Sequence, residues 1–191
     1  MRILRAVLLL AAMITFSAAV VADDYDDTIA RFKKAGATAD YFNYSYGYAV
    51  FPTIAKGGLI IGGAHGNGRV YQKGQYVGDT SVTQVSIGLQ IGGQGYSQII
   101  FFEDKRAFDE FTTGSYEFDA GVSAVAIDKS ASSSAGTTGT QVGTSKGEDK
   151  SSSRAGGYYK GVAVFTIIKG GAMAEAAVAG QKFSYKPRAA S

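Results

Sequence analysis

A glycine-rich stretch in the first half of the chain has the spacing of a phosphate-binding loop. Residues 63–70 read GAHGNGRV, with glycines placed as such a loop needs them. A phosphate-binding loop also needs a lysine for the phosphates and a serine or threonine for the metal ion, where this chain has Arg69 and Val70. The stretch therefore predicts tight turns and close backbone packing, and it argues against a nucleotide site.

His65 is the single histidine of the chain, so any Ser-His-Asp triad would have to use it. The serine context closest to a nucleophile elbow is residues 95–99, GYSQI, which lacks the second glycine. One histidine and no cysteine also cannot build an ordinary zinc site. We therefore expect His65 to be a polar residue of a flexible turn.

Paired carboxylates are the remaining candidates for catalysis. The pairs at 103–104 and 109–110 are adjacent in sequence, and adjacent helix residues do not face each other. Glu117 and Asp119 lie two apart on a predicted strand and share a face, which is a better acid–base geometry. A solvent-facing strand edge explains that pair more simply. The sequence thus predicts no catalytic centre, no cofactor and no metal, and a hydrolase using His65 or the Glu117 and Asp119 pair is the weakest hypothesis.

The first 22 residues have the pattern of a secretory signal peptide. Arg2 and Arg5 form a basic start, residues 6–21 an apolar core, and residues 20–22 the small-residue site that signal peptidase recognises. The apolar run is shorter than the roughly 20 residues of a spanning helix, although an uncleaved anchor is the alternative. We expect an exported periplasmic protein that starts at Asp23, a location compatible with peripheral contact with the outer membrane.

Removal of this peptide takes away two arginines, so the formal net charge falls from +3 to about +1. A nucleic-acid binder carries a stronger basic excess, and we expect no nucleic-acid partner. The chain has no cysteine, so its stability in an oxidising compartment must come from a hydrophobic core. The 191 − 22 = 169 remaining residues suit one domain.

The predicted N-terminal helical segment, residues 23–47, precedes all strands. Residues 23–35 place Tyr25, Ile29 and Phe32 on one helix face. A second helical stretch, 38–46, is dense in aromatic residues. The domain therefore begins with one or two helices.

From residue 48 the pattern changes to strands. A hairpin over 49–61 turns at a glycine pair, and residues 81–91 alternate between one apolar and one unusually small face. Residues 99–102 form an apolar run typical of a strand buried on both faces. A short helix capped by Asp104 follows this central strand, and residues 116–127 form a further strand or pair of strands.

These patterns predict an α+β fold that is mainly β: one compact domain of antiparallel strands and hairpins over residues 48–187. Residues 129–157 are nearly all Ser, Gly, Thr, Ala and charged residues, which predicts a flexible surface loop inside the domain. Residues 188–191 form a tail.

Two apolar segments end in the same Lys-Gly-Gly sequence. Residues 49–58 read AVFPTIAKGG and residues 163–171 read AVFTIIKGG, with Pro52 unmatched. A block this short that occurs twice favours two related hairpins over a solenoid, and chance similarity is the alternative. Related hairpins would put Lys56 and Lys169 at corresponding turns.

Four glycine-centred blocks resemble the SYLF domain family, in the order of that family: residues 47–58, 62–71, 90–94 and 180–185. The resemblance spans roughly residues 41–187. It implies a compact β-rich domain with flanking helices that binds lipids. Eukaryotic relatives bind phosphoinositides and couple membranes to actin, neither of which an exported bacterial protein meets. For this chain the resemblance implies association with phospholipid or a membrane surface, and residues 129–157 look like a variable insertion.

Basic residues are the candidates for contact with lipid head groups. An amphipathic helix with lysines beside its apolar stripe can lie in a bilayer interface, and basic turn residues can meet anionic phosphates. The candidates are Arg31, Lys33, Lys34, Lys56, Arg69 and Lys169.

Two hypotheses lead. The first is a lipid-binding module of the cell envelope. The second is a structural module of the envelope that binds a protein partner or associates with itself, motivated by the high glycine and β content and the absence of catalytic groups.

Overall fold

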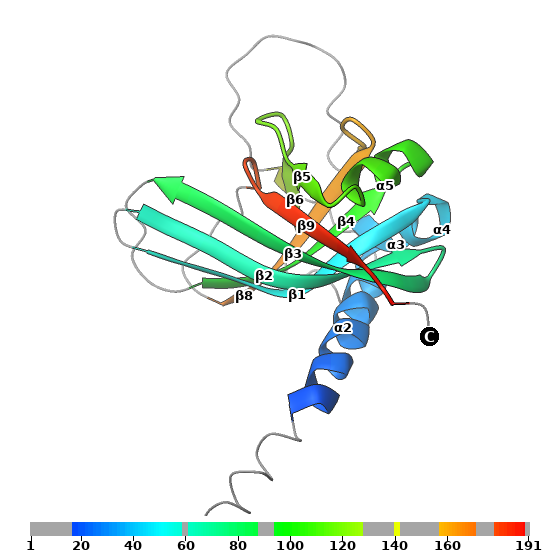
Figure 1. Cartoon of the computed structure of the whole chain (residues 1–191), viewed down its shortest axis with the longest axis horizontal. Helices are drawn as coiled ribbons and strands as arrows, with labels where there is room; N and C mark the ends of the chain where they lie inside the picture. The colour runs from blue at the N-terminus through cyan, green and yellow to red at the C-terminus, as the bar shows by residue number, and fades with distance from the viewer. Residues whose placement is uncertain are drawn as a thin grey trace, which may run out of the picture.

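A curled sheet dominates the described part of the chain (Figure 1). The computed structural model describes residues 17–58, 61–87, 94–127, 140–141, 157–170 and 178–189. In chain order they form α2 (Ser17–Lys34), α3 (Gly36–Ala39), α4 (Tyr41–Tyr44), β1 (Gly47–Gly58), β2 (Ile61–Gln72), β3 (Gln75–Ile87), β4 (Gln94–Phe102), α5 (Lys105–Phe111), β5 (Ser115–Glu117), β6 (Ala124–Ile127), β7 (Thr140–Gln141), β8 (Val162–Gly170) and β9 (Lys182–Pro187).

The nine strands of these residues form one sheet in the order β5-β9-β3-β2-β1-β4-β8-β6-β7. Neighbouring strands are antiparallel except β6 and β8, which run parallel. The predicted α+β, mainly β fold is confirmed, and the sheet is mixed where purely antiparallel pairing was expected. The parallel pair arises because the chain returns from β6 to β8 through residues 128–161, a connection long enough to cross over.

β1 and β2 form the first predicted hairpin, paired from Gly47–Gln72 to Gly58–Gly62. The expected turn at the glycine pair is wrong, because Gly57 and Gly58 are strand residues that pair with Gly63 and Gly62. The expectation of a turn around His65 is wrong, because residues 61–72 are one strand and His65 pairs with Ala55 and Thr83 on its two sides. The glycines of β2 serve close packing instead. A Cβ atom at Gly66 would lie 2.7 Å from the backbone oxygen of Thr53.

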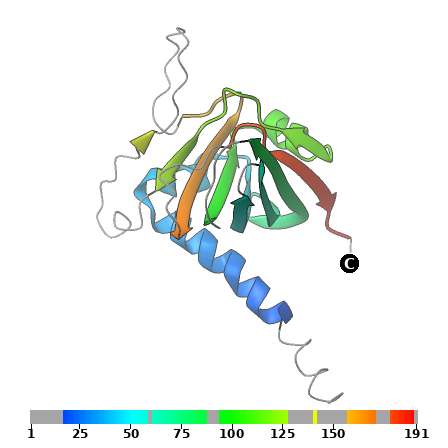
Figure 2. The same cartoon turned by 90° about the vertical axis from the view of Figure 1, so that its left-hand side faces the viewer.

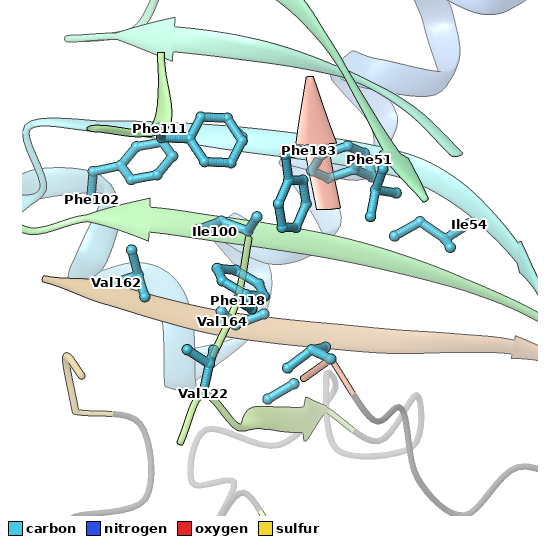
Figure 3. Packing of buried hydrophobic residues seen from close by; sticks show 14 of the residues in the cluster. Phe51, Ile54, Ile100, Phe102, Phe111, Phe118, Val122, Val162, Val164 and Phe183 are labelled. Atoms are coloured by element: carbon cyan, nitrogen blue, oxygen red, sulfur yellow. The ribbon is translucent and has the colours of Figure 1, made fainter. Parts of the chain in front are cut away.

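Apolar clusters cover parts of both faces of the sheet. The inner face, on which α5 packs, carries a large apolar cluster that Figure 3 shows from close by. Its members include Phe51, Ile54, Ile100, Phe102, Phe111, Phe118, Val164 and Phe183. The outer face packs against α2, which lies below the sheet in Figure 2, and against α3 and α4. β4 serves both faces: all four residues of 99–102 are fully buried, as predicted.

The short helix after the central strand is confirmed as α5. Asp104 caps it, because its Oδ1 accepts a hydrogen bond from the backbone N–H of Ala107 at 2.8 Å. Ala107, Phe108 and Phe111 are buried against the inner face. The segment 116–127 contributes two strands, β5 and β6, as one of the two predicted alternatives.

The N-terminal segment differs in detail from the single second helix that was expected. α2 ends at Lys34, Ala35 is extended with φ −77° and ψ 119°, and two short helices, α3 and α4, follow in place of one over 38–46. Residues 1–16 of the predicted signal peptide lie outside the described residues.

Two further predictions concern segments of which the structure describes only a part. In β3, Gln84 is buried, whereas Val85 is 79% exposed, so the small face of this strand turns inward. Segment 178–181 approaches that face, since Gln84 Nε2 donates to the carbonyl of Ala179 at 2.8 Å. Of the predicted loop 129–157, Thr140 and Gln141 pair with β6, Gly157 is exposed, and the rest lies outside the described residues.

Candidate functional site

Three of the six candidate basic residues lie together at the end of α2. Arg31, Lys33 and Lys34 are all exposed, and they occupy the last turn of the helix, where cations complement the helix dipole. None of the ion pairs found among the described residues involves them. Their charges are thus available to an anionic partner.

The chain folds this basic turn against α4. Lys33 Nζ lies 5.4 Å from the ring centroid of Phe42, a cation–π contact. Tyr44, at the end of α4, is 82% exposed. We call residues 31–44 the basic corner: it holds three cations and one acid, Asp40, for a net charge of 3 − 1 = +2.

The apolar stripe of α2 is used inside the protein. Tyr25, Ile29 and Phe32 are 6%, 8% and 0% exposed, and they pack on the outer face of the sheet. Burying each such side chain contributes about 1.5–3 kcal/mol. The predicted helix is therefore confirmed, but its apolar face is covered by its own domain and not open to a bilayer.

Arg69, the fourth candidate, holds α2 on the sheet. Its guanidinium lies 4.3 Å from the ring centroid of Tyr25 in α2 and 5.0 Å from that of Tyr76 in β3. Arg188 approaches the same Tyr76 ring at 5.2 Å. Burial raises the pKa of the Tyr25 hydroxyl, and the charge of Arg69 partly offsets that increase. The half-buried Arg69 is placed to fasten a helix, and the structure does not bring it to the basic corner.

Lys56 and Lys169 lie at one end of the sheet but point to opposite faces. Lys169 Nζ donates to Thr53 Oγ1 at 2.8 Å on the outer face. Lys56 follows Ile54 by two residues, on the side of the inner cluster. The sequence echo therefore does not repeat in space, because the two segments start on opposite faces: Ala49 belongs to the inner cluster and its counterpart Ala163 to the outer one.

The candidate catalytic residues are dispersed. Glu117 pairs with Lys182 at 3.6 Å, and Asp119 pairs with Lys160 at 2.5 Å. The hydrogen bond from Lys160 is the main reason that the pKa of Asp119 is lowered. His65 and Glu117 lie on one row of the sheet, separated by three strand spacings, or about 14 Å. No group of three metal-ligating side chains occurs within the described ranges.

Sequence reasoning missed a polar cluster inside the inner face. Gln98 and Gln181 are fully buried, and Gln98 Nε2 donates to Gln181 Oε1 at 2.9 Å. Gln181 Nε2 in turn donates to the hydroxyl of Tyr96 at 2.9 Å. The signal was visible in the sequence: Gln98 interrupts the apolar end of β4, where a glutamine needs a partner. The cluster pins the turn 178–181 onto the sheet.

The buried hydroxyl in this cluster makes stability depend on alkaline pH. Burial raises the pKa of Tyr96 from its ordinary value of 10.0 to about 12. Between these values the unfolded chain loses the proton and the folded chain keeps it, so this contribution is complete below pH 10 and declines as pH rises. When the pH is raised from 9 to 11, we expect the free energy of unfolding to fall by about 1 kcal/mol less in Tyr96→Phe than in the wild type. Urea unfolding at both pH values measures this difference, and equal losses would contradict the assignment.

None of the helices in the portion that the structure describes is long and apolar enough to cross a membrane. The described residues offer a basic, aromatic surface at residues 31–44.

Comparison with known proteins assigns the family. Residues 83–189 match the Ysc84 family, described as Las17-binding protein actin regulator, which is the family of the SYLF domain. The chain is also 30% identical over 146 residues to Beta cell expansion factor A of Aeromonas veronii. That match covers 74% of this chain and 46% of the relative, so the chain spans about half of the relative's length. The family match covers more than half of the chain, and the protein belongs to the Ysc84, or SYLF, family.

Proposed function

We propose that this protein is a non-enzymatic, lipid-binding protein of the bacterial cell envelope that contacts anionic phospholipid at a membrane surface. The observation that carries the proposal is the exposed set Arg31, Lys33 and Lys34, which has no acidic partner among the described residues. An anionic leaflet attracts such residues by about 1 kcal/mol each. The SYLF family supports a binding role, and the pattern of residues 1–22 supports export to the periplasm.

Vesicle sedimentation tests the proposal. The purified chain, its N-terminus read by mass spectrometry, is mixed with zwitterionic or anionic vesicles at low and high salt. We expect binding to anionic vesicles that weakens with salt, because the attraction of exposed charges is screened. Changing Arg31, Lys33 and Lys34 together to glutamine is expected to weaken binding by roughly 150-fold at low salt.

A matched control separates position from net charge. Changing Lys105, Arg106 and Lys160 to glutamine also removes three cations, but from α5 and the turn before β8. We expect this variant to lose only a small part of the binding. Equal losses in both variants would show a net-charge effect, and failure of the wild type to bind any vesicle would refute lipid binding.

A protein-interaction module is the second candidate, and the family description favours it, since it names proteins that bind Las17. In this reading the chain binds a protein partner in the envelope or a second copy of itself. Sedimentation velocity over a wide concentration range tests self-association. A sedimentation coefficient that stays constant would exclude the self-associating form.

A further inference from the structure

We infer that the protein docks on a membrane as a rigid body, with Tyr44 of the basic corner as its interfacial anchor and α2 still packed on the sheet. This inference rests on the lipid-binding function proposed above, and it adds which surface meets the bilayer and how. The competing mode is insertion, in which α2 leaves the sheet and its apolar stripe enters the bilayer.

α2 is fastened to the sheet from Tyr25 to its C-terminal end. Its stripe is buried from Tyr25 to Phe32, and the Arg69 guanidinium covers the Tyr25 ring at 4.3 Å. At the other end, the buried Thr38 hydroxyl contacts the carbonyls of Phe32 and Ala35, which ties α2 to α3. Insertion would break these contacts and would also uncover the apolar outer face of the sheet.

The charges along α2 also oppose insertion. Asp24, Asp26 and Asp27 flank Tyr25 and are exposed, so entry of the Tyr25 face would bring three carboxylates against an anionic surface. Desolvating a carboxylate without a partner is costly. When α2 stays on the sheet, its acidic residues lie toward its N-terminus and its cations at its C-terminus. The field of an anionic membrane then turns the basic end of α2 toward the membrane.

Tyr44 ends α4, the short helix whose Phe42 ring Lys33 contacts. The rings of Tyr41 and Phe42, from the same short helix, pack on Phe101 at centroid distances of 5.2 and 4.9 Å. These contacts hold α4 against the outer face, while Tyr44 itself is 82% exposed, more than Val85 or Tyr159, the other large hydrophobic residues that the described part exposes. A tyrosine with an apolar ring and a polar hydroxyl suits the head-group region of a bilayer. The corner therefore combines a fixed aromatic anchor with three cations.

Two tryptophan reporters distinguish the modes, because the chain has no tryptophan of its own. Tyr44→Trp places the fluorophore at the proposed anchor, and Tyr25→Trp places it under Arg69, where an indole keeps the cation–π contact. Each variant is mixed with anionic vesicles whose acyl chains are brominated near the head group. We expect quenching and a blue shift for Tyr44→Trp, and no quenching for Tyr25→Trp.

Each other outcome has a defined meaning. Quenching of Tyr25→Trp would overturn rigid docking in favour of insertion, and bound vesicles without quenching of Tyr44→Trp would overturn the anchor. Failure of both variants and the wild type to sediment with vesicles would refute lipid binding itself. As a check that needs no fluorophore, Tyr44→Ala is expected to weaken vesicle binding several-fold, whereas Tyr159→Ala, which removes another exposed tyrosine, is expected to leave it unchanged.

Discussion

Gly66→Ala is expected to lower the free energy of unfolding by about 3 kcal/mol. The new Cβ atom would lie 2.7 Å from the carbonyl oxygen of Thr53, 2.8 Å from Cγ1 of Ile54 and 3.1 Å from its Cα. Two of these neighbours are backbone atoms of β1 next to its bulge, and they cannot move without disturbing the pairing of β1 with both β2 and β4. The strain therefore has no flexible side chain to relax into.

Gly63→Ala is the matched control in the same strand. A Cβ atom there meets only the backbone oxygen of Gln84, at 3.6 Å, which is ordinary van der Waals contact. We expect a change within about 0.5 kcal/mol, since alanine also restricts the unfolded chain. Urea unfolding of both variants measures the difference. A Gly66→Ala protein as stable as Gly63→Ala would show that β1 does not approach β2 this closely.

The same glycines explain which part of the fold the sequence could not reveal. α2, β1, the doubly buried end of β4 and the Asp104 cap of α5 all follow from periodicity and capping. β2 has no such signal, because the glycines at alternate positions erase its apolar period. Only the position of the β1 bulge requires glycine at 66 and 68, and that bulge is a tertiary feature.

The sequence predicted the cations of the candidate site, but it did not predict the exposed Tyr44. Helical periodicity places Arg31, Lys33 and Lys34 at the end of α2, beside the stripe. Whether Tyr44 faces the core depends on how α4 is turned after Asp40, which the contacts of Tyr41 and Phe42 with Phe101 decide. In a helix as short as α4, the spacing of Tyr41, Phe42 and Tyr44 does not tell which side chain faces the core.

Gln181→Leu is expected to lower the free energy of unfolding by about 3 kcal/mol, the second large effect. Leucine has a similar size, so the loss is polar: the buried amide of Gln98 loses its partner, and the Tyr96 hydroxyl loses its donor. The surroundings are mainly apolar, so few groups can replace the lost partners. Gln72→Leu is the control, since Gln72 bonds the Tyr46 hydroxyl where water can replace it, and a loss below about 1 kcal/mol is expected.

The double variant Gln98→Leu/Gln181→Leu decides whether the pair acts as a unit. Removing both amides leaves only the Tyr96 hydroxyl without its bond. The double variant is therefore expected to lose about as much unfolding free energy as Gln181→Leu alone, which is well below the sum of the two single losses. Additive losses in urea unfolding would mean that each glutamine is stabilised by separate contacts. A pair that gives little net stability still selects one structure, because only one placement of the turn 178–181 satisfies Gln98, Tyr96 and Gln84 together. That selection fixes where β9 meets β3, and with it the closure of the inner face.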